Sequence, residues 1–270
     1  MTTGTLEKME CTLNSPVEYQ LPVGDARISM NERLGELLTL HYTGNIYCIY
    51  CNRKTKKSFN QGYCFPCSQR LARCDNCIVR PEKCHYDEGT CREPEWGLAN
   101  CMQTHYVYLA NSSGLKVGIT RETNIPTRWI DQGAVQALPI LKVSSRLQSG
   151  LVEVALKAHV SDKTDWRKML KGISADVELD AERDALLASN KQALDDISMR
   201  FPGEISAVEN AEVISINYPV LEYPVKVTSL NFDKTPEISG VLKGIKGQYL
   251  ILDTGVLNIR KFGGYEVAVE

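Results

Sequence analysis

The sequence predicts an α+β protein with a zinc-binding module in its middle, and three observations support this class. Strand-like runs separated by glycine turns occupy both ends of the chain, at 1–44 and 213–270. Nine of the ten cysteines lie between residues 45 and 101, most of them in C-x2-C pairs. Apolar residues at helical spacing follow between 150 and 200. The 270 residues are enough for several modules with buried cores.

The two terminal segments are expected to form one small β module. Glycine-containing turns such as Gly24-Asp25 and Gly263-Gly264 separate their strand-like runs. Because the ends of a domain tend to lie close together, we expect both segments to build one sheet or barrel, with the rest inserted between them. The strands expected in the C-terminal segment are 213–216, 225–227, 248–252, 256–259 and 265–269.

The first cysteine set consists of two C-x2-C pairs, Cys48/Cys51 and Cys64/Cys67, with twelve residues between them. Each pair can present two thiolates roughly 3.7 Å apart, which is an edge of the tetrahedron around a zinc ion. A redox-active C-x2-C motif is the alternative. Zinc is favoured because two pairs are present and neither obviously begins a helix. We therefore expect a zinc-ribbon-like module with one structural zinc ion.

A second cysteine set predicts a second structural zinc ion. The ligands expected there are one C-x2-C pair and two later cysteines: Cys74, Cys77, Cys84 and Cys91. His85 and Cys101 compete for the last two positions, and buried free thiols are the alternative to any metal. Four thiolates leave no open coordination position, so both sites would support the fold rather than catalyse a reaction.

The charge balance leaves nucleic-acid binding by the zinc region open. The net charge of −2 argues against binding driven by charge over the whole chain. Residues 41–130 carry 12 Lys/Arg against 7 Asp/Glu, but two four-thiolate zinc sites would reduce this excess to about +1. A basic face therefore requires that the cations of the region cluster in space: Arg53, Lys54, Lys56, Lys57, Arg70 and Arg73. A solvated basic loop is the alternative.

The segment after the cysteines contains two short strand motifs, Tyr106-Val107-Tyr108 and Lys116-Val117-Gly118. They stand where the GIY-YIG nuclease superfamily has Gly-Ile-Tyr and Tyr-Ile-Gly, so residues 104–172 resemble that family. Arg128 stands near the place of its helical catalytic Arg, and Glu153 at that of its metal-binding Glu. Tyr106 replaces the first Gly. Lys116 replaces the second Tyr, as in a phage-type branch, and puts the usual two-tyrosine chemistry in doubt. The whole layout also resembles an uncharacterised prokaryotic family.

This resemblance implies a phosphodiester-cleaving site with five catalytic residues: Tyr106, Tyr108, Lys116, Arg128 and Glu153. Glu153 would hold Mg²⁺ or Mn²⁺, and the Arg128 guanidinium matches phosphate oxygens. A tyrosine could activate water, and Lys116 could do so only with a depressed pKa. Each residue also has a structural interpretation: half-buried strand tyrosines, an edge-strand lysine, and an ion pair between Arg128 and Glu153.

The remaining chain is expected to contain helices. Residues 150–160 have helical spacing, and one long helix with an acidic face is predicted over 176–200. The expected parts are thus 1–44, 45–101, 102–175, 176–212 and 213–270. No run reaches the roughly 18–20 apolar residues that span a membrane, and no signal peptide is recognisable, so we expect a cytoplasmic protein without membrane partners.

Three hypotheses of function remain after these considerations. The first is a nucleic-acid-acting enzyme in which the zinc knuckles position DNA or RNA and the GIY-YIG-like site cuts it with a divalent cation. The second is a non-catalytic module that binds nucleic acid or another protein through a degenerate nuclease fold. A scaffold without a nucleic-acid role is a third reading, because the net charge is close to neutral.

Overall fold

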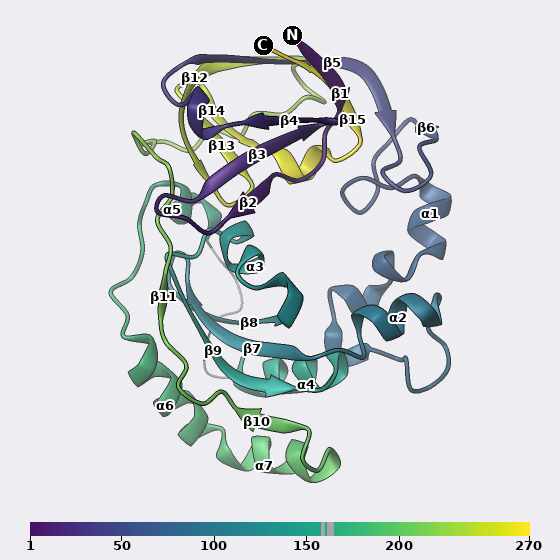
Figure 1. Cartoon of the computed structure of the whole chain (residues 1–270), viewed down its shortest axis with the longest axis vertical. Coiled ribbons are helices and arrows are strands. Elements are labelled where there is room, and N and C mark those ends of the chain that lie inside the picture. Colours follow the sequence, from purple (N-terminus) through teal and green to yellow (C-terminus); the bar gives the residue numbers. More distant parts are fainter. Residues whose placement is uncertain (158–159, 161–164) are drawn as a thin grey trace.

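A computed structural model of the chain describes residues 1–157, 160 and 165–270. Figure 1 shows the strands of both chain ends gathered at the top, a second sheet with helices below them, and the cysteine-rich segment, from β6 (Lys54–Thr55) to α2 (Pro94–Asn100), at the right, beside both. The two termini lie close together. The cysteine-rich residues 45–101, called the zinc module below, thus connect two separate sheets.

Among the described residues, both chain ends lie in one seven-stranded sheet, called the end-strand sheet below. The first strand pairs antiparallel with the last, with Thr2 opposite Val269, and the last pairs with β5. The expectation that the two ends build one sheet is therefore confirmed. The strand order is β1 (Thr2–Thr5), β15 (Tyr265–Val269), β5 (Leu37–Tyr47), β12 (Glu237–Lys246), β13 (Tyr249–Leu252) and β14 (Gly255–Asn258), with β6 (Lys54–Thr55) paired to β5.

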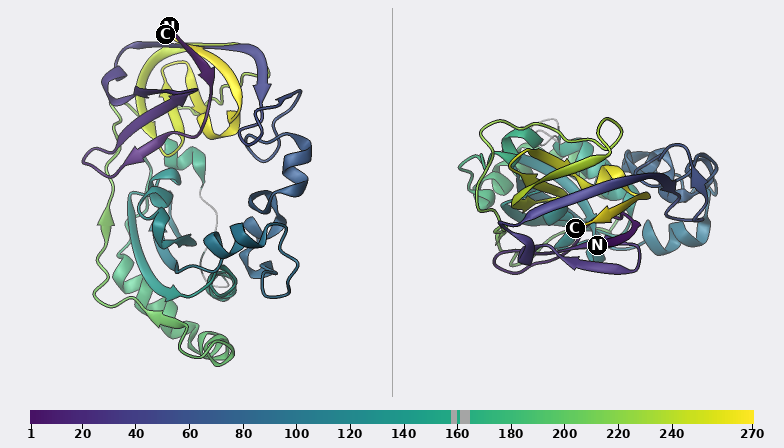
Figure 2. Two further views of the ribbon diagram at one scale, coloured as in Figure 1. Left: turned by 45° about the vertical axis from the view of Figure 1, so that its right-hand side comes forward. Right: turned by 90° about the horizontal axis from the view of Figure 1, so that it is seen from above.

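A small second sheet covers the end-strand sheet. It consists of β2 (Glu10–Thr12), β3 (Glu18–Val23) and β4 (Ala26–Ser29), and the 3₁₀ turn η1 (Asn31–Arg33) follows it. Tyr19 and Leu21 of β3 are buried in the same cluster as Leu40 of β5 and Phe262 of the turn η6 (Ile259–Phe262). The view from above in Figure 2 shows these strands lying across the strands of the end-strand sheet.

The C-terminal strands differ from the prediction in three places. No strand forms at 225–227. Strand β11 (Ile214–Ser215) pairs with β9 (Gln136–Val143), which belongs to a separate sheet described below, instead of joining the end-strand sheet. The ten-residue strand β12 was not predicted, because glycines interrupt its apolar pattern. Gly240 and Gly244 are needed there, since a Cβ on either would lie within 3 Å of Asp253 or Val220.

The central sheet has the order β10 (Ile205–Ala207), β9 (Gln136–Val143), β7 (His105–Asn111) and β8 (Leu115–Arg121). On one face, Val107 and Val117 pack against Val152 of helix α4 (Arg146–Leu156). On the other face, Tyr108 joins the core of the end-strand sheet together with Trp129 of helix α3 (Thr127–Asp131). The Tyr108 face is therefore enclosed between two sheets.

The helices agree with the prediction in part. Helix α4 begins at a capping box of Ser145 and Gln148, and the predicted extension to residue 160 passes through 158–159, which lie outside the described residues. Helix α5 (Trp166–Leu170) follows. The single helix predicted over 176–200 is wrong: α6 (Leu179–Ser189) and α7 (Lys191–Arg200) meet at Asn190. The Asn190 side chain donates to the Leu186 carbonyl at 2.8 Å and competes with the helical backbone. No described helix is long and apolar enough to cross a membrane.

Candidate functional site

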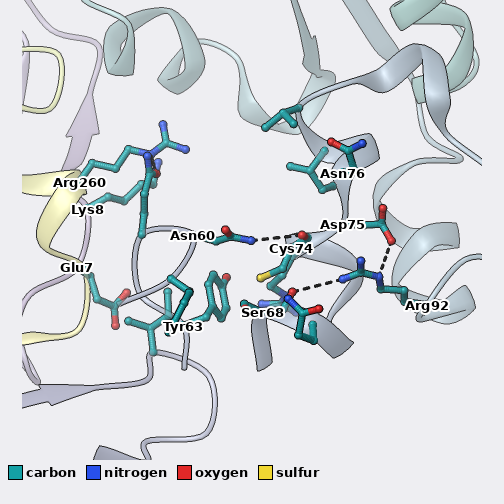
Figure 3. A pocket seen from close by; sticks show the side chains of 18 residues that line it. Glu7, Lys8, Asn60, Tyr63, Ser68, Cys74, Asp75, Asn76, Arg92 and Arg260 are labelled. Atoms are coloured by element: carbon teal, nitrogen blue, oxygen red, sulfur yellow. Dashed lines mark hydrogen bonds and ion pairs between the residues drawn. The ribbon is translucent and has the colours of Figure 1, made fainter. Parts of the chain in front are cut away.

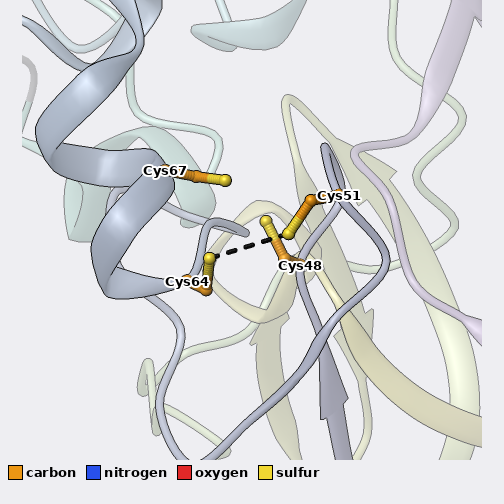
Figure 4. Close-up of side chains that lie close together, drawn as sticks. All are labelled: Cys48, Cys51, Cys64 and Cys67. Carbon is orange, nitrogen blue, oxygen red and sulfur yellow. Dashed lines mark hydrogen bonds between the residues drawn. The ribbon is translucent and has the colours of Figure 1, made fainter.

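Four cysteines meet where the end-strand sheet passes into the zinc module. Strand β5 ends at Tyr47, and a turn carries Cys48 and Cys51 before the chain returns as β6. Cys64 is the N-cap of helix α1 (Phe65–Arg70), and Cys67 lies in its first turn. Figure 4 shows the four thiol groups pointing toward one another from the turn and the helix. The predicted first set is thus brought together.

The geometry of these thiols fits a zinc ion. All four sulfur atoms lie within 4.8 Å of one another, and the Cys51 and Cys64 sulfurs are 3.8 Å apart. Zinc–sulfur bonds of about 2.3 Å require tetrahedral edges of about 3.8 Å. Burial raises the pKa of Cys48, but backbone N–H groups of Cys51, Cys64 and Tyr50 outweigh burial and lower the pKa to about 6. The cluster therefore indicates a zinc-binding site.

Contrary to the expectation from the sequence, the pair Cys64/Cys67 begins a helix, α1. Pro66 is tolerated in the first turn of this helix, where its missing N–H is not needed. The redox interpretation is disfavoured for a different reason. Both C-x2-C pairs converge on one point, which is the arrangement of a closed four-thiolate site.

A large pocket of about 820 Å³ lies between the zinc module and the end-strand sheet. Figure 3 shows Lys8 and Arg260 on one wall and Arg92 and Asp75 on the other, with Cys74 between them. Arg73 also lines the pocket. Asp75 is ion-paired with Arg92 at 2.6 Å and Glu7 also lines the pocket, so the lining carries four cations and two carboxylates. The pocket, called the basic pocket below, also contains amide and aromatic side chains: Asn60, Gln61, Gln69, Asn76, Phe59 and Tyr63.

The expected cluster of cations in the zinc region forms only in part. Of the six predicted cations, Arg73 alone is among the residues that line the basic pocket. Arg70 and Arg73 both lie over the ring of Tyr50, and Lys57 lies over Phe59. The pocket's other cations come from distant parts of the chain, which residue spacing within the zinc region could not reveal.

Tyr108 is the centre of the second constellation, in the central sheet. Its hydroxyl donates a hydrogen bond to Gln132 Oε1 at 2.9 Å, and the Arg128 side chain lies close enough to act on it electrostatically. The Glu153 carboxylate is close enough to influence the pKa of Tyr108, which is raised mainly by burial. These residues and Lys116 are called the Tyr108 cluster below.

The β7–β8 hairpin leaves space for the ring of Tyr108 at Gly118. Gly118 lies directly opposite Tyr108, and a Cβ on Gly118 would lie 2.6 Å from the Tyr108 Oη. On the other side, the register of β7 with β9 shifts between Val107 and Tyr108, where Pro139 is the partner. Proline cannot donate to the ladder, and bulges of this kind redirect side chains. The glycine of the second motif is therefore explained by the tyrosine of the first.

Lys116 lies on the same face of the hairpin and is only 5% exposed. Burial, assisted by the positive charge of Arg128, lowers the pKa of Lys116 to about 7. Glu153 is ion-paired with Lys157 at 3.3 Å, one helical turn further along α4. Tyr106 does not join them: its hydroxyl donates to Glu122 Oε1 at 3.2 Å. Tyr108, Arg128 and Lys116 thus approach one another. Glu153 lies on α4, which packs against the opposite face of the sheet, and its described link to them is an electrostatic influence on Tyr108.

The second cysteine set is divided by the structure. Cys77, Cys84 and Cys91 line one small cavity, whereas Cys74 packs beside the first four-cysteine cluster and lines the basic pocket. The reason is local: Cys74 ends the 3₁₀ turn η2 (Ala72–Cys74), Asp75 is extended, and Cys77 lies in a new turn η3 (Asn76–Ile78). Cys74 and Cys77 therefore lie beside different cavities, and Cys101 lines the small cavity together with Cys77.

Several residues of the sites were not singled out from the sequence. Gln132 binds the Tyr108 hydroxyl, and Asp131, beside it on α3, forms an ion pair with Lys8 at 2.9 Å. Asp131 also accepts from Gln248 at 2.8 Å. Arg260 lies within electrostatic range of Asp131 and Arg128, and so connects the basic pocket with the Tyr108 cluster. No sequence motif marks these contacts between distant segments.

Comparisons with known proteins give one match. The profile of a family described as "Protein of unknown function (DUF2797)" matches residues 35–267, which is most of the chain. No curated protein and no solved structure matches the chain.

Proposed function

The chain belongs to the DUF2797 family, and we propose that it is a zinc-stabilised protein that cleaves nucleic-acid phosphodiester bonds. The four-cysteine cluster stabilises the fold, the basic pocket holds the phosphate backbone, and the Tyr108 cluster performs the reaction. The observation that carries this proposal is the convergence of Tyr108, Arg128 and Lys116 from two strands and a helix. These positions match the motifs by which residues 104–172 resemble the GIY-YIG nucleases.

The roles of the side chains follow from their protonation states. The raised pKa of Tyr108 keeps its hydroxyl protonated, so it donates hydrogen bonds and does not act as a base. Lys116, with a pKa of about 7, is largely neutral above that pH and accepts the proton of an attacking water. Arg128 supplies the positive charge that a pentavalent phosphate requires. Lys116 thus replaces the second tyrosine of the family motif.

A divalent cation would be held by Glu153, whose side chain is 12% exposed. Mg²⁺ or Mn²⁺ accepts a site with one protein carboxylate when water and substrate phosphate complete the shell. When bound, the cation would neutralise charge on the phosphate oxygens. Lys157 is ion-paired with Glu153, so this ion pair would have to open before the carboxylate could bind a cation.

The basic pocket supports a nucleic-acid substrate. Four cations line it, and Arg260 lies close to Arg128, so a phosphate chain in the pocket would lead toward the Tyr108 cluster. Cations with interleaved aromatic and amide side chains suit backbone contact and base stacking. Single-stranded nucleic acid fits this combination, because its bases are free to stack.

Cleavage tests the enzymatic proposal directly. The zinc-loaded chain is incubated with labelled single- and double-stranded DNA and RNA in Mg²⁺ or Mn²⁺. Wild type should produce fragments. Glu153→Gln should lower the rate at least about 100-fold and leave binding unchanged, and the exposed Glu182→Gln of α6 serves as the matched control. No cleavage of any substrate by wild type would contradict the proposal.

One observation favours a second candidate, a non-catalytic nucleic-acid-binding module. Tyr108 is fully buried and Lys116 nearly so, which leaves little room for a phosphodiester. Binding without cleavage would support this candidate. In either case Arg73→Gln and Arg260→Gln should each weaken binding and reduce its salt slope by about 1, whereas Lys54→Gln, outside the pocket lining, should not.

A further inference from the structure

The second, smaller cavity of the zinc module is lined by four cysteines. Cys77, Cys84, Cys91 and Cys101 contribute to its wall, together with Asp75 and His85. Its volume of about 10 Å³ corresponds to a single atom-sized guest. A cavity of this size is too small for an organic ligand but suits one metal ion.

The four thiols come from separate rigid turns that meet at this cavity. Cys77 lies in η3, Cys84 is the C-cap of the turn η4 (Pro81–Lys83), and Cys101 is the C-cap of helix α2 (Pro94–Asn100). The Cys84 and Cys101 side chains lie close together. Cys77 is within electrostatic range of both Cys84 and Cys91. The four thiols therefore border one cavity, and since no three of these sulfurs are within 4.8 Å of one another in the described part of the chain, a metal ion would have to draw them together.

The competing ligands have other partners. Asp75 forms an ion pair with Arg92 at 2.6 Å, and its other oxygen caps η3 by accepting from the Cys77 N–H at 3.3 Å. His85 Nδ1 lies 2.7 Å from the Thr90 hydroxyl. Asp75, Cys77 and His85 nevertheless have ligand atoms within 4.8 Å of one another, and His85 Nε2 lies 3.7 Å from Asp75 Oδ2, so the imidazole is the geometric alternative to one thiol. Thiolates are favoured because four cysteines line the same cavity and Zn²⁺ binds thiolates in closed structural sites.

We propose that Cys77, Cys84, Cys91 and Cys101 hold a second zinc ion in a closed four-thiolate site. This set differs from the spacing-based prediction by one residue, because Cys101 takes the place of Cys74. Arg146 offsets the negative charge of such a site, since it lies close to Cys77, Cys84 and Cys101. Its guanidinium also donates to the Ile78 carbonyl at 2.6 Å.

This zinc ion would stabilise the contact between the zinc module and helix α4. The Arg146 N–H at the start of α4 donates to the Cys101 carbonyl at 2.8 Å. Gly150, one turn later, lies so close to η4 that a Cβ there would clash with the backbone of Pro81 and Glu82. Helix α4 carries Glu153, so the second zinc ion would hold the helix of the Tyr108 cluster in position. The zinc site itself does not depend on the proposed cleavage activity.

Zinc content tests the proposal. Wild type should contain two zinc ions per chain by elemental analysis. Cys101→Ser and Cys84→Ser should each contain about one, whereas Cys74→Ser, the matched control in the same C-x2-C pair, should retain two. One zinc ion in wild type would overturn the site. Loss of zinc from Cys74→Ser or His85→Gln, with two ions kept by Cys101→Ser, would overturn the ligand set.

A measurement on the wild-type chain removes the dependence on variants that fail to fold. When Co²⁺ replaces zinc, the absorption spectrum should be that of two tetrathiolate centres. The thiolate-to-cobalt charge-transfer absorption should double between one and two equivalents of Co²⁺ per chain. Saturation at one equivalent, or a second centre with the spectrum of mixed sulfur and nitrogen ligands, would overturn the proposal.

Discussion

The substitution Gly118→Ala tests whether the two motifs of the hairpin depend on each other. A Cβ at this position would lie 2.6 Å from both the Cζ and the Oη of Tyr108. Non-bonded atoms require about 3.5 Å, so the ring must move by roughly 1 Å. Tyr108 is fully buried, and its hydroxyl is 2.9 Å from Gln132. A shift of this size therefore strains the packing and weakens the hydrogen bond to Gln132.

The expected cost follows from these two effects. Overpacking of a core costs about 1–3 kcal/mol, and the weakened hydrogen bond about 1 kcal/mol. Replacing glycine reduces the entropy of the unfolded chain, which offsets about 0.5 kcal/mol. Gly118→Ala should therefore lower the free energy of unfolding by about 2–4 kcal/mol. Gly114→Ala is the matched control, since it lies in the same hairpin and nothing is within 4 Å of its Cβ.

Urea unfolding in zinc-containing buffer, followed by tryptophan fluorescence, measures both variants. Trp129 is a suitable reporter because its ring is 5.9 Å from that of Tyr108. In a Tyr108→Leu background, whose side chain is too short to reach Gly118, the cost of Gly118→Ala should fall below about 0.5 kcal/mol. Equal unfolding midpoints for Gly118→Ala and Gly114→Ala in the otherwise wild-type chain would refute the reasoning.

Three further predictions concern other parts of the chain. Lys116 has a pKa of about 7 in the folded chain and an ordinary value of 10.5, so the unfolded chain binds more protons between these pH values. The difference in unfolding free energy between wild type and Lys116→Met should therefore rise by about 1 kcal/mol per pH unit between pH 7 and 10.5, and should be constant below pH 7. Urea titrations that give the two chains the same pH dependence would contradict this. Cys67→Ser should lose the first zinc ion and the hydrogen-exchange protection of α1, and a full zinc content would exclude Cys67 as a ligand. Asp131→Asn breaks the contacts of a side chain that is 6% exposed and should cost about 1–3 kcal/mol of unfolding free energy. Glu10→Gln removes an exposed ion pair and should cost less than about 0.5 kcal/mol, and a similar loss for both would disprove the role of Asp131.

The features predictable from the sequence are those that local spacing determines. The first zinc site depends on two C-x2-C pairs, and each pair forms one short turn or helix start. The pairing of the chain ends was also predictable, because both segments have strand-like patterns. Strand β12 was missed because the reason for Gly244 lies in the distant residue Val220. The helix break at Asn190 depends on a side-chain hydrogen bond that periodicity does not detect.

The limits of sequence reasoning are clearest at the sites. The motifs marked Tyr108 and Lys116, but burial of Lys116 beside Arg128, which lowers its pKa, requires the folded sheet. The basic pocket joins Lys8 and Arg260 from opposite ends of the chain to the zinc module, so no local pattern could predict it. In the second cysteine set, spacing alone suggested that Cys74 and Cys77 share one metal ion, whereas the two lie in separate short turns.

The pH dependence of single-turnover cleavage tests the proposed function most directly. A labelled single strand is incubated with excess zinc-loaded wild-type chain in Mg²⁺ or Mn²⁺ between pH 5.5 and 9, a range of about two units on either side of the expected midpoint. The cleavage rate should rise with pH and level off above a midpoint near the Lys116 pKa of about 7, and Lys116→Met should abolish this rise. A wild-type chain that binds the strand without cutting it at any pH, or a rate that Lys116→Met leaves unchanged, would contradict the account.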